Sequence, residues 1–351
     1  MPQYRNREIR ANPTTTLTDG NTDAVGRYHS GMRVLLPFLL LSAMIAAERP
    51  ANRAVDLELP IAGQPIQLRV RLPSVPTGPC PVIIFSHGLG GSHEGYWLMT
   101  EEWASAGFAV IQPSHPGSDT AMVREAGIFE AEAALRRAAS DPAILTGRPR
   151  LISRLIDALP EIRARLTDWP GSFDTSRIGV GGHSFGAWTA LAVDGIAYPV
   201  PDLGTAADPR PRAFLALSAP GPGRFPADPA AATRPLLLVS GTEDRQPEML
   251  DPRDGIERGP AWRIALFPLL PPGDKFLAVL TGAHHCAFSH GQGARLSGEP
   301  APAPWMTAML LRTTTRWWQA WLQDDQQALI SLRDGSAVPA ESRQLVRWEA
   351  R

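Results

Sequence analysis

One serine lies between two glycines where an apolar run gives way to helix-forming residues. Gly182-His-Ser-Phe-Gly186 follows Ile178–Val180 and precedes Ala187–Asp194. This is the G-x-S-x-G pattern, in which a tight strand-to-helix turn exposes a serine hydroxyl at the end of a strand, close to a helix N-terminus. The pattern alone can arise by chance in a chain with 31 glycines. The strand–turn–helix context is what makes Ser184 the candidate nucleophile.

A serine hydroxyl is a poor nucleophile at neutral pH and needs an imidazole base, which a carboxylate must orient. Downstream of Ser184 the chain has three histidines, His284, His285 and His290. His284 and His285 follow the apolar run Phe276–Leu280, where a loop at a strand end can bring an imidazole over the serine. The residues alone do not decide which of these two histidines is the base.

The orienting carboxylate is expected after the preceding strand, because the order along such a chain is serine, acid, histidine. The run Leu236–Val239 is followed by Ser-Gly-Thr-Glu-Asp244, which offers Glu243 and Asp244. The earlier run Ala213–Ala219 ends in no acidic residue. We therefore predict Asp244 as the acid, against the simpler interpretation of a solvated turn carboxylate.

Acyl transfer also requires N–H donors for the oxyanion of the tetrahedral intermediate. One candidate is the backbone of Phe185, and the other is Leu89 in the loop Ser86-His-Gly-Leu-Gly-Gly-Ser92, which follows Val82–Phe85. A glycine-rich loop can also cradle a phosphate. This loop lacks the lysine of a P-loop, and the chain has no G-x-G-x-x-G, so no nucleotide or other cofactor is predicted.

Four further polar residues adjoin these positions. His87 and His183 are expected to support the loops that carry Leu89 and Ser184, and His87 is also a tentative pocket residue. His115, in Pro113-Ser-His-Pro-Gly117 after another strand end, either lines the pocket or has a structural role. Cys286 beside the paired histidines suggests a metal site, but no further acidic or cysteine ligand is near, so no metal is predicted.

Short, fully apolar runs recur along the chain and are typical of strands buried on both faces of a parallel sheet. They are Val82–Phe85, Ala109–Ile111, Ile178–Val180, Ala213–Leu217, Leu236–Val239 and Phe276–Leu280. Two earlier strands, Ala54–Leu59 and Ile66–Leu72, form an expected hairpin, and helices are predicted at Glu94–Ser105, Ala187–Asp194 and the tryptophan-rich Pro304–Gln323. The alternation predicts a doubly wound α/β sandwich.

The interval of residues 119–174 breaks this alternation because it contains no strand-like run. Apolar residues from Leu151 to Leu159 predict an amphipathic helix ended by Pro160, and Glu125–Arg137 predicts another. We interpret the interval as a helical, cap-like insertion, with an elongated crossover as the alternative.

The N-terminal region has the layout of an exported precursor. Residues 1–31 are polar without apolar periodicity, and residues 32–47 combine Arg33, a short apolar run and small residues before Glu48. This is typical of a signal peptide and is shorter than the roughly 20 apolar residues of a membrane span. A buried or anchoring helix is the alternative, and Met32 is a second candidate start. We predict a single domain over residues 48–351, located in the periplasm or secreted, without a stable membrane span.

The net charge is −1 and the chain has no basic runs, so the sequence does not predict the basic surface with which proteins bind nucleic acid. Cys80 precedes one predicted strand and Cys286 follows the far end of another. Because these positions belong to opposite edges of a parallel sheet, we predict no disulfide between them.

Taken together, the motifs resemble the α/β-hydrolase superfamily, and more narrowly its dienelactone hydrolase-like and platelet-activating-factor acetylhydrolase-like branch. The resemblance spans roughly Asp56 to Gln323. It is carried by Phe85-Ser-His-Gly-Leu-Gly-Gly91, Ser114-His-Pro-Gly117, Gly181-Gly-His-Ser-Phe-Gly-Ala187, Gly241-Thr-Glu-Asp244 and Gly282-Ala-His-His-Cys-Ala-Phe-Ser289. In that branch the histidine loop reads Gly-Ala-x-His-x-x-Phe-Ser, which implies His285 as the base and leaves His284 as the variable position.

The resemblance implies an α/β-hydrolase fold, a doubly wound, mostly parallel central sheet with helices on both faces. It also implies a metal-independent serine esterase in which Ser184 is acylated and water releases the acid. Dienelactone hydrolases use a cysteine nucleophile, and Ser184 departs from that pattern. The expected substrates are small-molecule or lipid-like esters. An amidase or peptidase with the same triad, and a non-catalytic binding protein of this fold, are the alternative functions.

Overall fold

The computed structural model describes residues 52–196, 206–222, 228–250, 255–289 and 298–351. These residues belong to one compact unit, Pro50–Arg351. The predicted N-terminal extension and signal peptide, residues 1–47, lie outside the described residues.

The core is a nine-stranded sheet with the order β1-β2-β4-β3-β5-β6-β7-β8-β9. Its strands are β1 (Asn52–Ile61), β2 (Gln64–Pro73), β3 (Pro79–Ser86), β4 (Ala109–Pro113), β5 (Ser172–His183), β6 (Pro211–Leu217), β7 (Leu236–Glu243), β8 (Lys275–His284) and β9 (Val346–Ala350). Strands β3 to β8 run parallel. The hairpin β1–β2 and strand β9 add antiparallel edges. The predicted mostly parallel sheet with an opening hairpin is confirmed.

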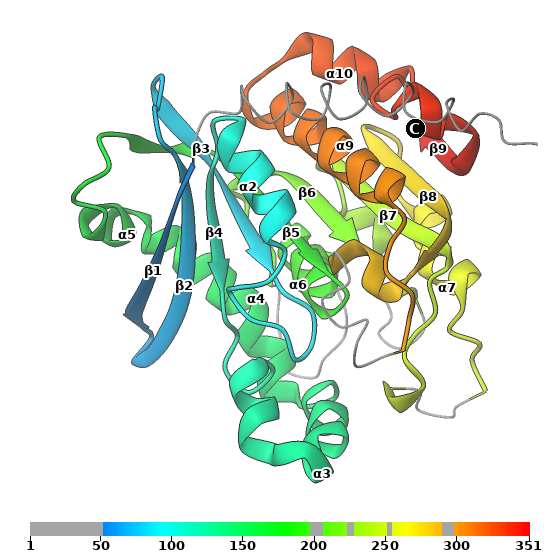
Figure 1. Cartoon of the computed structure of the whole chain (residues 1–351), viewed down its shortest axis with the longest axis horizontal. Coiled ribbons are helices and arrows are strands. Elements are labelled where there is room, and N and C mark those ends of the chain that lie inside the picture. Colours follow the sequence, from blue (N-terminus) through cyan, green and yellow to red (C-terminus); the bar gives the residue numbers. More distant parts are fainter. Residues whose placement is uncertain (1–51, 197–205, 223–227, 251–254, 290–297) are drawn as a thin grey trace, which may run out of the picture. The chain divides into compact units, whose positions relative to one another are not determined.

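Helices pack on both faces of this sheet (Figure 1). On one face lie α2 (Trp97–Ser105), α9 (Pro304–Leu322) and α10 (Gln326–Arg333). On the other lie α4 (Pro142–Asp157), α5 (Leu159–Arg165) and α6 (Phe185–Asp194). Tryptophans of α9 pack inward: Trp317 and Trp318 are fully buried, and Trp317 makes an edge contact with Phe276 of β8. The doubly wound arrangement therefore forms two apolar layers with the sheet between them.

The remaining short elements occupy connections. They are α7 (Pro260–Ile264) and the 3-10 turns η1 (Pro229–Ala231), η2 (Glu248–Leu250), η3 (Phe267–Leu269), η4 (His285–Ser289) and η5 (Ala340–Leu345). Sequence analysis did not predict β9 or α10. Strand β9, Val-Arg-Trp-Glu-Ala, carries charged residues because it is an edge strand, and it therefore lacks the apolar run that marks a buried strand.

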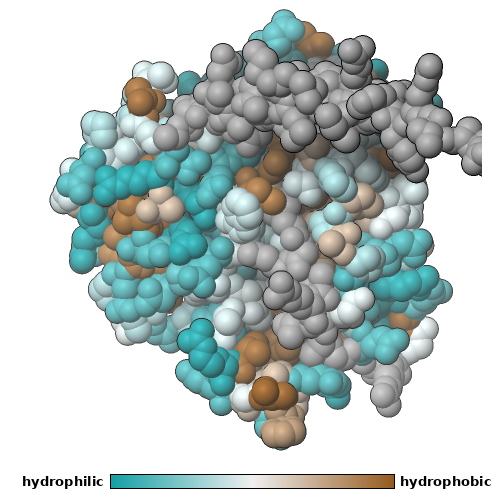
Figure 2. Space-filling view, in the orientation of Figure 1, coloured by the Kyte–Doolittle hydropathy of each residue, from teal (hydrophilic) through white to brown (hydrophobic). Residues whose placement is uncertain are grey.

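The interval after β4 is helical, as predicted, and contains α3 (Thr120–Ala138), α4 and α5. Helix α3 is interrupted at Gly127, whose φ of 72° and ψ of 172° are not helical. Beyond that break Ile128 and Phe129 are 93% and 99% exposed, and Figure 2 shows apolar residues at this end of the insertion. Within the described residues, no helix has both the length and the apolarity needed to cross a membrane.

The two cysteines lie at opposite ends of parallel strands. Cys80 is buried at the beginning of β3, and Cys286 is half-buried directly after the end of β8. The two cysteines therefore lie at opposite edges of the parallel sheet, which is the placement on which the prediction of no disulfide was based.

Candidate active site

Ser184 forms the turn between β5 and α6 at the carboxyl edge of the parallel strands. Its φ of 55° and ψ of −114° are rarely adopted by residues other than glycine. The backbone is held there because Ser184 N–H donates to Leu217 O of β6 over 2.9 Å. The flanking glycines are required by space. A Cβ on Gly182 would lie 2.3 Å from the Gly186 carbonyl, and a Cβ on Gly186 would lie 1.9 Å from Ser86 O.

The structure brings the predicted base and acid to this serine. His285 Nε2 lies 2.9 Å from Ser184 Oγ, and His285 Nδ1 lies 3.0 Å from Asp244 Oδ1. With the proton on Nδ1, the imidazole donates to Asp244 and accepts from the serine hydroxyl. His284 is instead the last residue of β8 and lies opposite Glu243 in the β7–β8 ladder. His285, and not His284, is therefore placed to take the serine proton.

Asp244 is fully buried and is held at both oxygens. Its Oδ1 accepts from His285 and from Ser218 Oγ over 2.9 Å, and its Oδ2 accepts from Ser240 Oγ over 2.8 Å. Burial alone would raise the pKa of this carboxyl. The positive charge of Arg263 and the hydrogen bonds from His285 and Ser218 outweigh burial and hold the pKa of Asp244 well below its usual range. The acid is therefore ionised at neutral pH.

Ser218 is a part of the site that sequence analysis missed. It follows β6, whose end carries no acidic residue, and it has a positive φ of 49°. Its Oγ lies 2.7 Å from His285 Nδ1 and 2.9 Å from Asp244 Oδ1, so the hydroxyl can donate to the carboxylate while facing the imidazole. The available signal was a polar residue at the end of a buried strand beside the nucleophile strand.

Arg263 of α7 is a second missed residue, buried against the acid and the base. Its Nε lies 3.2 Å from Asp244 Oδ1, as an ion pair without good hydrogen-bond geometry. Its Nη2 lies 3.2 Å from His285 Nδ1. Asp244 thus balances one permanent cation and is also placed to stabilise a second, transient one on His285.

A buried relay connects the glycine-rich loop to the base. Gly88 N–H donates to Tyr96 Oη over 3.1 Å, and Tyr96 Oη lies 2.9 Å from His183 Nδ1. His183 Nε2–H donates to His285 O over 3.0 Å, which leaves Nδ1 to accept from the tyrosine. Burial lowers the pKa of His183 to about 3, and the nearby His285 adds to the effect. His183 is therefore a neutral connector, as predicted for a supporting residue.

The two residues whose backbone N–H groups are predicted as oxyanion donors line the same pocket as the serine. Leu89 and Phe185 both line it together with Ser184. Phe185 is the first residue of α6, so its N–H has no acceptor within the helix and is available to a ligand. The helix N-terminus also contributes a partial positive charge at this point.

Contrary to the prediction, His87 and His115 are not among the residues that line this pocket. Both are about 1% exposed and lie behind the glycine-rich loop, with ring centroids 5.1 Å apart. His87 Nε2 accepts from His115 N–H over 3.0 Å, and His87 Nδ1–H donates to Gly88 O over 2.6 Å. Burial holds the pKa of each imidazole well below its usual value. They are neutral supports of the loop, because its tight glycine backbone needs partners on its inner side.

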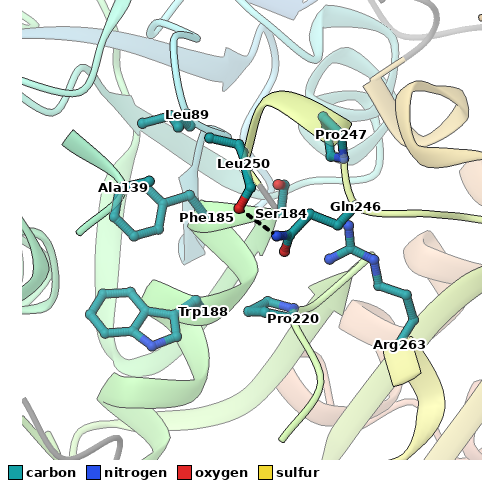
Figure 3. A pocket seen from close by; sticks show the side chains of 10 residues that line it. All are labelled: Leu89, Ala139, Ser184, Phe185, Trp188, Pro220, Gln246, Pro247, Leu250 and Arg263. Carbon is teal, nitrogen blue, oxygen red and sulfur yellow. Dashed lines mark hydrogen bonds between the residues drawn. The ribbon is translucent and has the colours of Figure 1, made fainter. Parts of the chain in front are cut away.

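The pocket beside Ser184 is mostly apolar (Figure 3). It is lined by Leu89, Ala139, Ser184, Phe185, Trp188, Pro220, Gln246, Pro247, Leu250 and Arg263. Ala139, directly after α3, belongs to the helical interval between β4 and β5, so this interval contributes to the lining of the pocket. No three side chains of histidine, cysteine, aspartate or glutamate converge as a metal-binding group within the described part of the chain.

Comparison with known proteins agrees with this geometry at the level of the family. No curated protein matches the chain in sequence. Residues 83–347 match the family described as "Alpha/beta hydrolase family", a segment that begins in β3 and ends in β9. This match covers most of the chain and all of the candidate site. The protein therefore belongs to the alpha/beta hydrolase family, whose members are generally hydrolytic.

Proposed function

We propose that this protein is a serine carboxylic-ester hydrolase in which Ser184 is the nucleophile, His285 the base and Asp244 the acid. The observation that carries the proposal is the continuous hydrogen-bonded series from Ser184 Oγ through the His285 imidazole to Asp244, with distances of 2.9 and 3.0 Å. A strained turn exposes this serine beside an apolar pocket. Activated hydroxyls in such settings attack acyl carbonyls.

In the proposed reaction, His285 Nε2 takes the hydroxyl proton as Ser184 Oγ attacks the ester carbonyl carbon. The resulting oxyanion accepts from the N–H groups of Leu89 and Phe185. Collapse of the intermediate breaks the bond to the alcohol, and His285 gives its proton to the departing oxygen. Water then repeats the sequence on the acyl-enzyme and releases the acid. Asp244 keeps the imidazole oriented and stabilises its charged form.

The pocket supports small or lipid-like acyl groups as substrates. Its walls are mainly apolar side chains, among them Phe185, Trp188 and Leu250. The loops Phe85-Ser-His-Gly-Leu-Gly-Gly91 and Gly282-Ala-His-His-Cys-Ala-Phe-Ser289 favour the dienelactone hydrolase-like and platelet-activating-factor acetylhydrolase-like branch. We also propose that the enzyme is exported, on the basis of the signal-like residues 32–47.

A fluorophosphonate probe and a series of p-nitrophenyl esters of increasing acyl length test this function. The wild-type protein should be labelled at Ser184 and should hydrolyse the short esters fastest. Ser184→Ala should lose both labelling and turnover. Labelling that persists in this variant would assign the nucleophile elsewhere, and faster cleavage of acyl-peptides than of esters would identify an amidase or peptidase.

A further inference from the structure

Arg148 of the insertion is a buried cation that the proposed reaction does not use directly. Its side chain extends from α4 to the inner side of the glycine-rich loop, and the residue is only 2% exposed. The guanidinium donates to four oxygens on three segments of the chain. They are Ser86 Oγ (3.1 Å), the carbonyl of His87, Ser118 Oγ (2.9 Å) and Thr189 Oγ1 (3.0 Å).

These contacts connect the two segments that carry the proposed oxyanion donors. His87 is two residues before Leu89, so the bond to the His87 carbonyl fixes the beginning of that loop. Thr189 lies one turn into α6, and the Arg148 guanidinium carbon lies 4.5 Å from the centre of the Phe185 ring. A single planar group with fixed donor directions therefore joins the Leu89 loop to the Phe185 end of α6, where Gly186 also packs closely against Ser86 O.

Arg148 makes no direct ion pair, although the Asp119 carboxylate is near enough to favour its charged form. Within the described residues Arg148 has no carboxylate within 4 Å, unlike Arg263, which pairs with Asp244. Burial lowers the pKa of Arg148 to about 9, so the guanidinium remains protonated at neutral pH. An unpaired buried cation is costly to a fold. Negative charge that develops on a substrate oxygen in this water-poor region would be stabilised by that cation.

We propose that Arg148 is the positioning residue of the oxyanion hole: it fixes the Leu89 loop against α6 and supplies a positive field to the oxyanion. This inference rests on the proposed ester hydrolysis. It also assigns a role to the helical interval between β4 and β5, because α4 carries the arginine. Arg148 does not touch the reacting atoms; it acts through the loop and helix that it holds and through its charge.

The test compares Arg148→Gln, Arg148→Lys and a matched control, Arg163→Gln. Arg163 of α5 also donates to three carbonyls, those of Leu166, Trp169 and Gly171, and lies over the Trp169 ring. These contacts are near the beginning of β5, at the end of the strand opposite to Ser184. Both arginines can therefore lower stability when substituted, but only Arg148 should influence the oxyanion.

We expect Arg148→Gln to lower kcat by about 10- to 100-fold with less than about a threefold change in KM, because misplaced donors weaken the transition state more than the ground state. The affinity for a trifluoromethyl ketone, which forms a tetrahedral oxyanion adduct with Ser184, should fall by the same factor. Arg148→Lys keeps the positive charge but lacks the planar guanidinium with its several donors. Its kcat should lie between those of Arg148→Gln and the wild type. Arg163→Gln should leave kcat and ketone affinity unchanged.

Hydrogen exchange of the 87–91 amides separates the two proposals. It should accelerate in Arg148→Gln and not in Arg163→Gln, whether or not the protein cleaves esters. Unlabelled Ser184 in the wild type would refute the proposed function alone. Unchanged exchange, kcat and ketone affinity in Arg148→Gln, with Ser184 still labelled, would refute the role of Arg148 alone. If Arg148→Gln does not fold, wild-type values of all three in Arg148→Lys would lead to the same rejection.

Discussion

Two serines of the site have backbone conformations that cost free energy. Ser184 and Ser218 have φ angles of 55° and 49°, and both face His285 with hydrogen-bonding contacts of 2.9 and 2.7 Å. A residue other than glycine in this region costs of order 1–3 kcal/mol, which the surrounding structure must supply. Such strain is tolerated where a side chain has to be aimed at a particular atom. At this scale the site consists of two serines with strained backbones, whose hydroxyls both contact the His285 imidazole.

The two adjacent histidines should differ sharply in their contribution to activity. His285→Ala removes the group that receives the serine proton, so kcat should fall by at least about 10⁴-fold. His284→Ala is the matched control because His284 faces Glu243 across the β7–β8 ladder, and most of kcat should remain. Steady-state kinetics with a p-nitrophenyl ester measures both. The reverse pattern would assign the base to His284.

Ser218 should contribute to catalysis by orienting the acid and the base. Ser218→Ala removes a hydroxyl that contacts both Asp244 and His285, and kcat/KM should fall about tenfold, the worth of roughly one hydrogen bond. Ser218→Gly should lose the same activity but should be more stable than Ser218→Ala, because glycine accepts the positive φ without strain. Kinetics and thermal unfolding of the two variants separate these effects. Equal stabilities, or full activity in either, would contradict the assignment.

Among the elements, the buried strands were predictable and the contacts that join distant segments were not. Strands β3 to β8 are apolar because both faces are covered. The order of motifs along the chain led to Ser184 and Asp244, and the family resemblance implied His285 rather than His284. Arg148 could not be placed beforehand, because its bond to Ser86 joins positions 62 residues apart. Tyr96 and His183 are 87 residues apart. No local pattern encodes such pairs, since each depends on how an insertion or a loop packs.

The insertion helices offer a paired test of backbone conformation. Gly127 interrupts α3 at a positive φ, whereas Gly147 lies within α4, and an added Cβ would meet nothing within 4 Å at either position. Gly127→Ala should therefore destabilise the protein by about 1–3 kcal/mol through strain alone. Gly147→Ala should stabilise it by about 0.5–1 kcal/mol, because alanine loses less entropy in a helix. Urea unfolding of both variants measures the change in the free energy of unfolding. A change of the same sign in both variants would be inconsistent with a kinked α3.

At the scale of the whole molecule, one buried carboxyl should make folding stability depend on pH. Asp194 ends α6 with a fully buried side chain, and burial raises its pKa to about 7 although Arg234 lies 3.0 Å away and Lys275 is near. Between about pH 4 and 7 the folded protein then binds a proton that the unfolded chain releases. The free energy of unfolding should fall as the pH rises through this window.

Urea unfolding of the wild type and of Asp194→Asn at pH 5, 6, 7 and 8 tests this dependence. The asparagine side chain does not titrate, so the decline assigned to Asp194 should disappear in the variant. Parallel curves for the two proteins would show that Arg234 keeps the carboxylate ionised throughout the window. Asp157→Asn is a suitable control because Asp157 is an exposed carboxylate that also pairs with an arginine, Arg210.

The proposed export makes a prediction about the length of the functional chain. All the residues assigned to the site and to both apolar layers lie between residues 52 and 351. A chain that begins at Glu48 should therefore keep the kcat and the unfolding temperature of the full-length protein. When the complete gene product is expressed in a Gram-negative host, intact mass should show a periplasmic form that begins near Glu48, because small residues precede that position. An uncleaved product retained in the cytoplasm would contradict export, while the activity of the shortened chain would still report on the catalytic proposal by itself.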